Sequence, residues 1–235
     1  MTPPGLVALG GFSYKDTIIG TIDMKYSIII PCYTENENDI RRCFDSIKAQ
    51  TLEPYEVICV DDVSPVDTPR IAMEYGFTYV RHARNKNNGG ARNTGIRLAT
   101  GDYLVFVNAD DYLLPDALTL IDAVNNGQDM IIIGLQSFGD CLFNFIPDET
   151  NTPNTSLIGM NGEPLHVVNR KFILENDLFE IENVAFADVD WVKRLEACVK
   201  TYAYVPKALY MFQTGNENSL TTKILNGQLD GFKKY

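Results

Sequence analysis

The sequence is short of side chains that bind transition metals or form disulfide frameworks. It has only two histidines, and its five cysteines form no CxxC pair. Neither a zinc site nor a disulfide scaffold is therefore indicated. The two histidines, His82 and His166, also lack the context of a Ser-His triad, so hydrolase chemistry has little support. These absences favour a reducing, cytoplasmic setting.

Basic residues and long hydrophobic runs are also scarce. There are 20 lysines and arginines against 31 acidic residues, which gives a net charge of -11. Such a chain repels DNA, RNA and anionic lipid, so nucleic acid is a disfavoured partner. The apolar stretch from Gly5 to Phe12 is too short to cross a bilayer. We expect no integral membrane segment, and any contact with the inner face of a membrane would be peripheral.

The chain does contain alternating strand and helix signals from Lys25 onward. Strands are predicted at 26–30, 56–60, 78–80 and 103–107, with helices at 40–47, 68–75 and 90–99 between them and a further helix opened by Pro115. Asn36 or Asn38 can cap the first helix. This βαβαβαβα order predicts an α/β fold with a doubly wound, mostly parallel sheet flanked by helices.

The second half has a different pattern. It predicts a buried strand at 130–135, a polar loop at 148–162, helices at 170–175 and 189–197, and strands at 202–205 and 208–212. We divide the chain into an N-terminal extension (1–24), a first half (25–128) and a smaller second half (129–235) of the same domain.

Polar residues directly follow three of the predicted strands. Pro31 to Tyr33 follow the first strand, Asp61 and Asp62 the second, and Asn108 to Asp111 the strand at 103–107. Parallel strands would bring these elements together at the carboxyl edge of the sheet, where open α/β sheets bind ligands. Carboxylates at that edge indicate a cation and a ligand that carries phosphate.

Five segments in order resemble the motifs of family 2 glycosyltransferases with the GT-A fold. They are Tyr26 to Tyr33, Val60 to Thr68, Asn87 to Gly95, Ala99 to Tyr103 and Asn108 to Asp111, with a weaker match from Asn169 to about Thr222. The resemblance implies an inverting enzyme that uses a nucleotide-activated sugar and needs Mg²⁺ or Mn²⁺. It also implies a hydroxyl-bearing acceptor, typically a glycan of a surface polysaccharide. By the same resemblance, residues 25–128 are the nucleotide-sugar-binding half and residues 129–235 the acceptor-binding half.

The resemblance places the nucleotide against the ends of the first two strands. Pro31 is expected to end the first strand and turn the chain outward, which sets Tyr33 and Glu35 beside the base. The second Asp of the pair, Asp62, contacts the base in the family, and a carboxylate that accepts the imide N–H of uracil favours UDP. The alternatives are that Pro31 to Tyr33 merely terminate a buried strand, and that Asp62 serves a turn or helix cap.

Arg92 lies in the motif that the family places near the nucleotide. Arg81, Arg84 and Lys86 precede it and form the densest group of cations in the chain. A diphosphate needs such positive charge or a metal. For Arg81, Arg84 and Lys86 taken singly, a solvated loop is an equal alternative.

Asn108, Ala109 and Asp110 occupy the position of the family's Asp-x-Asp metal motif. Asn108 replaces the first acid, so it can bind a ribose or a metal-bound water but adds no charge. Asp110 is the predicted principal ligand of Mg²⁺ or Mn²⁺, with Asp111 close by. The alternative is an acidic turn that caps the helix after Pro115.

Asp188 matches the family's catalytic base at the start of a helix, with Ala187 in place of the usual Glu. Such a base takes the proton of the acceptor hydroxyl. Asp190 is the fallback, and either residue can be a helix cap. Trp191 is a candidate sugar platform or a buried core residue. Gln213 stands where a basic residue is frequent in the family, which removes one expected phosphate contact.

The departures at Asn108, Ala187 and Gln213 leave other functions open. A non-catalytic homologue that binds nucleotide sugars would bind UDP without turnover. A glycosyltransferase that acts on a hydroxylated nucleobase in DNA and a nucleotidyltransferase are weaker alternatives. The latter would carry a Gly-rich loop after the first strand, where this chain has Pro31 to Glu35.

Overall fold

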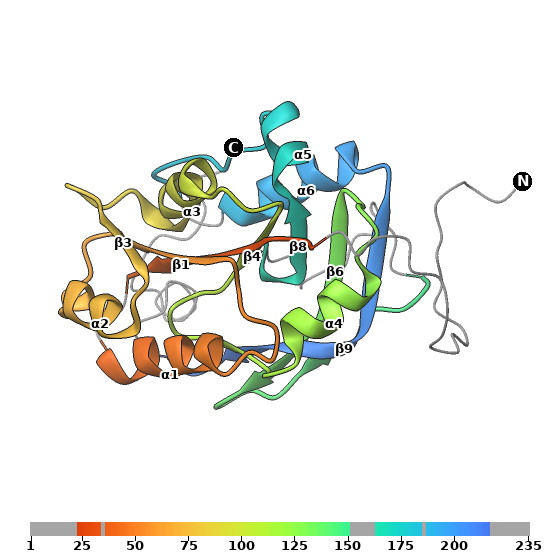
Figure 1. Cartoon of the computed structure of the whole chain (residues 1–235). Helices are drawn as coiled ribbons and strands as arrows, with labels where there is room; N and C mark the ends of the chain where they lie inside the picture. The colour runs from red at the N-terminus through yellow and green to blue at the C-terminus, as the bar shows by residue number, and fades with distance from the viewer. Residues whose placement is uncertain (1–22, 34–35, 151–162, 185–186, 217–235) are drawn as a thin grey trace, which may run out of the picture.

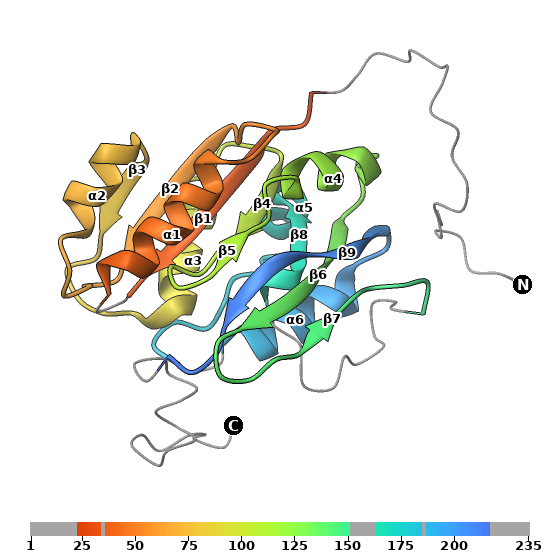
Figure 2. The same ribbon diagram turned by 90° about the horizontal axis from the view of Figure 1, so that it is seen from below.

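A nine-stranded sheet forms the centre of the molecule, with helices on both faces (Figures 1 and 2). The computed structural model describes residues 23–33, 36–150, 163–184 and 187–216. Most of the predicted extension 1–24 and most of the polar loop 148–162 lie outside these ranges. No helix among the described residues is long and apolar enough to cross a membrane.

The first half is the predicted parallel βα unit. Its strands and helices are β1 (Tyr26–Cys32), α1 (Glu37–Lys48), β2 (Glu56–Asp61), α2 (Thr68–Tyr75), β3 (Thr78–Arg81), α3 (Asn87–Leu98) and β4 (Tyr103–Phe106). The order β3-β2-β1-β4 is parallel throughout. Asn36 caps α1, because its side chain accepts a hydrogen bond from the backbone N–H of Asn38.

The second half extends the same sheet with mixed pairing. Its elements are β5 (Tyr112–Leu113), α4 (Ala117–Val124), β6 (Met130–Phe138), β7 (Asn144–Phe145), η1 (Glu163–Leu165), β8 (His166–Asn169), α5 (Arg170–Glu175), α6 (Ala187–Cys198) and β9 (Tyr202–Gln213). Strand β8 pairs antiparallel with both β4 and β6, whereas β6 and β9 are parallel. The α/β class is confirmed, but beyond β4 the parallel pairing is interrupted by antiparallel pairs.

Successive side chains along each strand point to opposite faces of the sheet, and they form one hydrophobic core on each face. Ile28 and Ile30 of β1 face the layer of α1, α2 and α4, whereas Ile29 faces α3, α5 and α6. Strands β1, β2 and β4 are buried on both sides, which explains their continuous apolar runs. Trp191 of α6 is fully buried in the second core and packs edge-on against Phe106, so it is a core residue and no open sugar platform.

Pro31 does not end β1, contrary to the prediction. The strand continues to Cys32, whose carbonyl accepts from the N–H of Asp62. Pro31 faces the other neighbour, β4, whose pairing with β1 stops at Ile29. Its missing N–H therefore costs no hydrogen bond in the sheet.

The strands predicted at 202–205 and 208–212 are one strand, β9. Its pairing with β6 shifts register on both sides of Gly134, which pairs with Ala208. A Cβ atom on Gly134 would lie 2.4 Å from the carbonyl oxygen of Lys207. Glycine thus lets the chain bulge at Pro206 and resume pairing. Helix α4 begins at Ala117 rather than at Pro115, and α3 and α6 begin earlier than predicted.

Candidate active site

The residues predicted to bind the nucleotide follow β1, β2 and β4 at one edge of the sheet. Tyr33 follows β1 and is 53% exposed, whereas Asp62 after β2 is 2% exposed. Asn108 to Asp111 follow β4. The parallel pairing of these strands brings their ends together, as expected. Glu35 lies outside the described residues.

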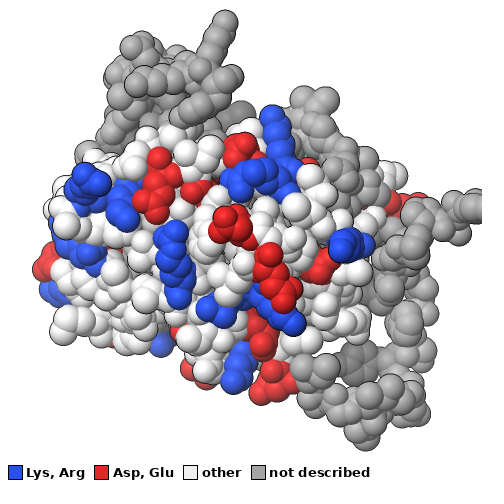
Figure 3. All heavy atoms as spheres, turned by 90° about the horizontal axis from the view of Figure 1, so that it is seen from above, with Lys and Arg blue, Asp and Glu red and all other residues white. Residues whose placement is uncertain are grey.

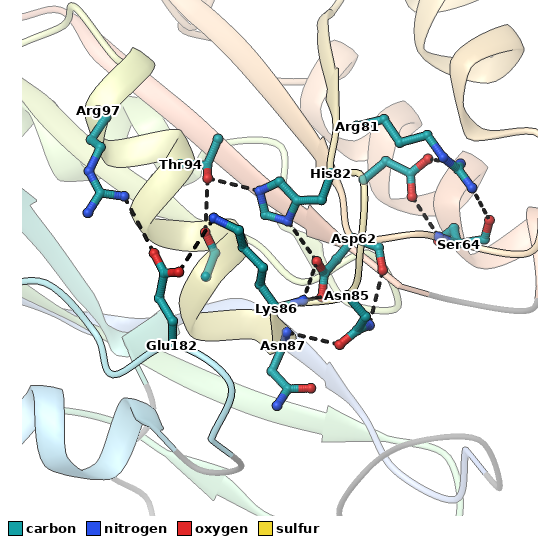
Figure 4. A network of polar contacts seen from close by, with 12 residues as sticks. Asp62, Ser64, Arg81, His82, Asn85, Lys86, Asn87, Thr94, Arg97 and Glu182 are labelled. Carbon is teal, nitrogen blue, oxygen red and sulfur yellow. Dashed lines mark hydrogen bonds and ion pairs between the residues drawn. The ribbon is translucent and has the colours of Figure 1, made fainter.

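Asp62 holds the loop that leads into α3 (Figure 4). Its carboxylate accepts from the backbone N–H of Lys86 at 2.8 and 3.0 Å, and it contacts Nδ1 of His82 at 2.7 Å. The other ring nitrogen of His82 lies 2.9 Å from Oγ1 of Thr94 in α3. The side chain of Asn85 donates to the carbonyl of Asp62 at 3.0 Å. Asp62 therefore organises residues 82–86, and its contact with a base stays a prediction.

Asp61 is fully buried and paired with the neighbouring strand. It accepts from Tyr79 and forms an ion pair with Arg81, and its other oxygen accepts from the N–H of Ser64. Arg81 is thus engaged in the protein, as is Lys86, whose ammonium pairs with Glu182. Arg84 is exposed and makes no ion pair with the described residues. Of the three cations before Arg92, it is the one left for a ligand.

Arg92 is buried and bridges two halves of the chain. Its Nη2 donates to Oδ1 of Asn108 at 3.0 Å, and its Nη1 lies 3.3 Å from both carboxylate oxygens of Glu180. Both side chains of this ion pair are at most 4% exposed. Arg92 thus joins α3 to the end of β4 and to the segment before α6.

Asn108 and Asp111 form a buried network with β9. The amide of Asn108 donates to Asp111 at 3.2 Å, and the Tyr210 hydroxyl donates to Asp111 at 2.6 Å. The N–H of Gln213 donates to the other oxygen of Asp111 at 2.7 Å. Burial, together with the charge of Asp110, raises the pKa of Asp111 to about 8. Asp111 faces β9 in this arrangement, and its predicted metal contact stays untested.

Asp110 is half-buried and has fewer protein partners. One carboxylate oxygen accepts from Asn216 at 3.1 Å, and the backbone carbonyl accepts from Nη2 of Arg42 at 2.6 Å. Burial raises the pKa of Asp110, while the Asn216 hydrogen bond opposes the rise. The same Nη2 of Arg42 also contacts the Gln213 side chain and Asp39. Arg42 thus brings a cation beside Gln213, where sequence reasoning expected none.

These residues fit a divalent cation held mainly by its substrate. No group of three or more His, Cys, Asp or Glu residues that could enclose a metal occurs in the described part of the chain. Asp110 alone offers a partly accessible carboxylate among Asn108 to Asp111. Mg²⁺ sites commonly use one or two carboxylates together with substrate phosphates and water.

Asp188 lies in the first turn of α6 and is partly exposed. Its negative charge raises the pKa of Glu180, second to burial among the raising causes. Asp188 is therefore near the Arg92–Glu180 pair. Asp190 pairs instead with Arg194 one turn along the helix, at 2.7 Å.

Sequence reasoning missed Glu180, Arg42 and Tyr210. Glu180 lies 88 residues from Arg92, and nothing in its local sequence pairs it with an arginine. Arg42 lies within the helix predicted at 40–47, and no motif of the sequence singles it out. Tyr210 lies in a predicted strand. The signal that could have identified it is the acidic pair Asp110 and Asp111, because a buried carboxylate needs hydrogen-bond donors such as the Tyr210 hydroxyl.

Charges of both signs alternate on the face that carries α3, α5 and α6 (Figure 3). Ion pairs contribute to this mixing, among them Arg97 with Glu182 and Lys171 with Glu175. On this face of the described residues a nucleic acid duplex would meet no continuous basic stripe.

Known proteins share this sequence pattern and fold. Residues 27–194 match the family model for glycosyl transferase family 2. Poly(ribitol-phosphate) beta-glucosyltransferase of Bacillus spizizenii is 43% identical over 103 residues, which are 40% of this chain and 16% of that protein. An uncharacterized glycosyltransferase of Rickettsia bellii is 32% identical over 198 residues, 76% of this chain and 28% of that protein. The chain thus spans less than a third of the length of these relatives.

Solved structures confirm the GT-A type of fold. S. aureus TarS in complex with UDP-GlcNAc superposes with a TM-score of 0.70 at 23% identity, over 81% of this chain and 59% of that chain. GalNAc-T7 with UDP, GalNAc and Mn²⁺ superposes with a TM-score of 0.62 at 16% identity, over 81% of this chain and 44% of that chain. With the family model covering most of its length, this chain belongs to glycosyl transferase family 2.

Proposed function

We propose that this protein transfers a sugar from a UDP-sugar to a hydroxyl group of a glycan acceptor, with inversion at the anomeric carbon. Several relatives are named for glycan synthesis, and the TarS structure contains UDP-GlcNAc. These names support a donor with a uracil base and an acceptor in a surface polysaccharide. We propose a hexosyl or N-acetylhexosaminyl group as the transferred sugar, because it fits both this donor and this acceptor.

One observation carries the proposal: the network around Arg92. It links Asn108 of the metal motif, through Arg92, to Glu180, whose neighbour is Asp188. Direct contacts therefore join Asn108 to Arg92 and Arg92 to Glu180, and the charge of Asp188, far away in the sequence, acts on Glu180. An acid at the start of a helix with only a capping role would not need this connection.

In the proposed reaction the acceptor oxygen attacks the anomeric carbon from the face opposite the UDP leaving group. A bond forms between that oxygen and the carbon, and the bond from the carbon to the phosphate oxygen breaks. The electron pair of the broken bond leaves with UDP, and the acceptor proton goes to the carboxylate of Asp188. A base so placed commonly accelerates such a step by ~10² to 10⁴-fold.

The leaving diphosphate needs positive charge. Asp110 would hold Mg²⁺ or Mn²⁺, with Asp111 behind it, and such an ion neutralises charge on a departing diphosphate. Exposed Arg84, and Arg42 beside Asp110, supply protein cations near the same edge. Asn108, which accepts from Arg92, and Ala109 are proposed to contact the nucleotide beside Asp110.

The nucleotide base is proposed to lie on Tyr33, which is exposed directly after β1. Pro31 fixes the backbone before it, and Glu35 is retained as a proposed neighbour. Asp62 has a carboxylate with about four acceptor positions, of which the protein uses three. The remaining one suits the imide N–H of uracil. A cytoplasmic enzyme with peripheral access to a membrane-linked glycan fits these features.

A panel of nucleotide sugars tests the proposal. Thermal shift is measured for each donor with Mn²⁺ and then with a chelator, and UDP release is measured with candidate acceptors. We expect UDP-sugars to stabilise the protein more with Mn²⁺, and Asp110→Asn to lose that difference. Asp116→Asn, which removes an acid paired with Lys207 away from the site, is the control and should match the wild type.

Two other outcomes would replace the proposal. Tight UDP binding without turnover on any acceptor would identify a non-catalytic nucleotide-sugar binder. Release of pyrophosphate from a nucleoside triphosphate would identify a nucleotidyltransferase.

A further inference from the structure

The two carboxylate oxygens of Asp62 have different partners (Figure 4). Oδ1 lies 2.7 Å from Nδ1 of His82 and accepts from the backbone N–H of Lys86 at 2.8 Å. Among the described residues, Oδ2 accepts from that same N–H alone, at 3.0 Å. Oδ1 is therefore occupied twice, whereas Oδ2 keeps one free acceptor position. The contact with His82 is what makes the two oxygens unequal.

The backbone of Asp62 is fixed separately from its side chain. Its N–H donates to the carbonyl of Cys32 at 2.8 Å, and its carbonyl accepts from the side chain of Asn85 at 3.0 Å. The carboxylate itself can still turn, because the last torsion of an aspartate has broad, two-fold minima. Backbone hydrogen bonds alone therefore do not decide which oxygen of Asp62 keeps the free acceptor position.

The His82 side chain is held between Asp62 and α3. It directly follows β3, is 7% exposed, and has its Nε2 2.9 Å from Oγ1 of Thr94. The Thr94 hydroxyl also lies 3.0 Å from the carbonyl of Gly90. Because a carboxylate only accepts hydrogen bonds, Nδ1 of His82 carries a hydrogen whichever neighbour the Thr94 hydroxyl donates to. Thr94 thus fixes the ring, and the ring directs its Nδ1–H at Asp62.

A free acceptor position on a carboxylate distinguishes between pyrimidine bases. Uracil has an imide N–H to donate, whereas cytosine has a lone pair at the same ring position, which a carboxylate repels. A site built to form a hydrogen bond rejects the analogue that cannot form it. If the oxygens of Asp62 interchanged, binding the base would first require the side chain to be ordered, and the discrimination would weaken.

We propose that His82 is a positioning residue that fixes the carboxylate of Asp62 and thereby sets the preference for uracil over cytosine in the nucleotide. This inference rests on the proposed function, in which Asp62 accepts the imide N–H of the base. His82 touches neither the base nor the reacting atoms and acts through Asp62. Its contact with Thr94 extends this arrangement to α3.

Two substitutions separate the contacts of His82. His82→Asn keeps an amide N–H near the place of Nδ1 and gives up Thr94, whereas His82→Gln keeps an amide near the place of Nε2 and gives up Asp62. Titration calorimetry with Mn²⁺ measures the Kd of UDP and of CDP. We expect the wild type to prefer UDP by about tenfold or more, His82→Gln to lose about fivefold of that ratio, and His82→Asn to keep it within about twofold. A merely structural role would weaken UDP and CDP binding alike and leave the ratio in place.

A matched control and a second measurement keep the test decisive. Tyr79→Phe removes one hydrogen bond, of 2.7 Å, from Asp61, the buried carboxylate that precedes Asp62, and should keep the wild-type ratio even if stability falls. The chain has only two histidines, so NMR of wild-type protein labelled with ¹⁵N-histidine reports on His82 directly. Its signal is the one missing in His82→Asn, and we expect a hydrogen on Nδ1. An Nδ1 without hydrogen would overturn the inference even if His82→Gln does not fold.

The outcomes separate this inference from the proposed function. A protein that binds UDP without turnover contradicts the proposed transfer, while the ratio of the two Kd values still tests His82. A wild type that binds UDP and CDP equally, or Asp62→Asn with an unchanged ratio, contradicts the placement of the base at Asp62 and this inference with it. A preference that Asp62→Asn loses and His82→Gln keeps contradicts the role of His82 alone.

Discussion

Val63, directly after Asp62, has a backbone conformation that valine rarely adopts. Its φ is 70°, in the left-handed region. A β-branched side chain is strained there, by about 1 to 2 kcal/mol relative to glycine. Strain of this kind concentrates at ligand sites, and Val63 adjoins the loop that Asp62 organises.

Val63→Gly should therefore stabilise the protein. Glycine removes the strain but gives the unfolded chain more freedom, so we expect a net gain of about 0.5 to 1 kcal/mol in the free energy of unfolding. Urea denaturation measures it. Val199→Gly, at a valine without positive φ, should lose stability, and a loss in both variants would disprove strain at Val63.

Asp111 should make stability depend on pH. Its pKa is raised from an ordinary 3.8 to about 8 by burial and by Asp110, so the folded state holds a proton that the unfolded state has released between these values. Its stabilising effect is full below 3.8 and is lost as pH rises through 8, at up to about 1.4 kcal/mol per pH unit.

Asp111→Asn should abolish the contribution of Asp111 to the pH dependence of the unfolding free energy. In chelator, unfolding free energies at pH 5, 6, 7 and 8 should fall less steeply in the variant than in the wild type. Asp140→Asn, at an exposed position, serves as the control and should follow the wild type. Equal slopes in all three proteins would show that Asp111 carries no proton in this range.

At the scale of elements, α3 approaches β1 closely because Gly95 has no side chain. A Cβ atom there would lie 2.3 Å from Cγ2 of Ile29, which is fully buried. Gly95→Ala should cost about 1 to 3 kcal/mol through overpacking, more than the helix propensity of alanine returns.

A second substitution should relieve that overpacking. In Gly95→Ala combined with Ile29→Ala, the total loss should be clearly smaller than the sum of the single losses, because the atom that clashes is gone. Chemical denaturation of the four proteins measures the coupling. If the two single losses in unfolding free energy simply add in the double variant, the cost of Gly95→Ala does not come from the contact with Ile29.

Elements with strong periodicity could be predicted from the sequence. Strands β1 and β2 are apolar because both their faces are buried, and Ile40, Phe44 and Ile47 mark the inner face of α1. Strands β5 and β7 have two residues each, too few for any period, and β8 has four. Their pairing is decided by distant partners, which local patterns do not contain.

At the scale of the whole molecule, the sequence predicted which strand ends meet at one edge of the sheet but not how the charged residues there are paired. Asp62, Asn108 and Asp110 follow strands that meet at one edge, as topology requires. Glu180, which pairs with Arg92, and Tyr210, which donates to Asp111, come from the second half of the chain. Contacts over such separations follow from the sheet order, which a single sequence does not specify.

The central claim is that Asp188 removes the acceptor proton while the donor is held elsewhere. It is tested by UDP release and UDP affinity in Asp188→Asn and in Asp190→Asn, whose parent residue pairs with Arg194. We predict that Asp188→Asn loses ~10²-fold or more in kcat with UDP affinity within about twofold of the wild type, and that Asp190→Asn stays active. Undiminished turnover in Asp188→Asn would contradict the account.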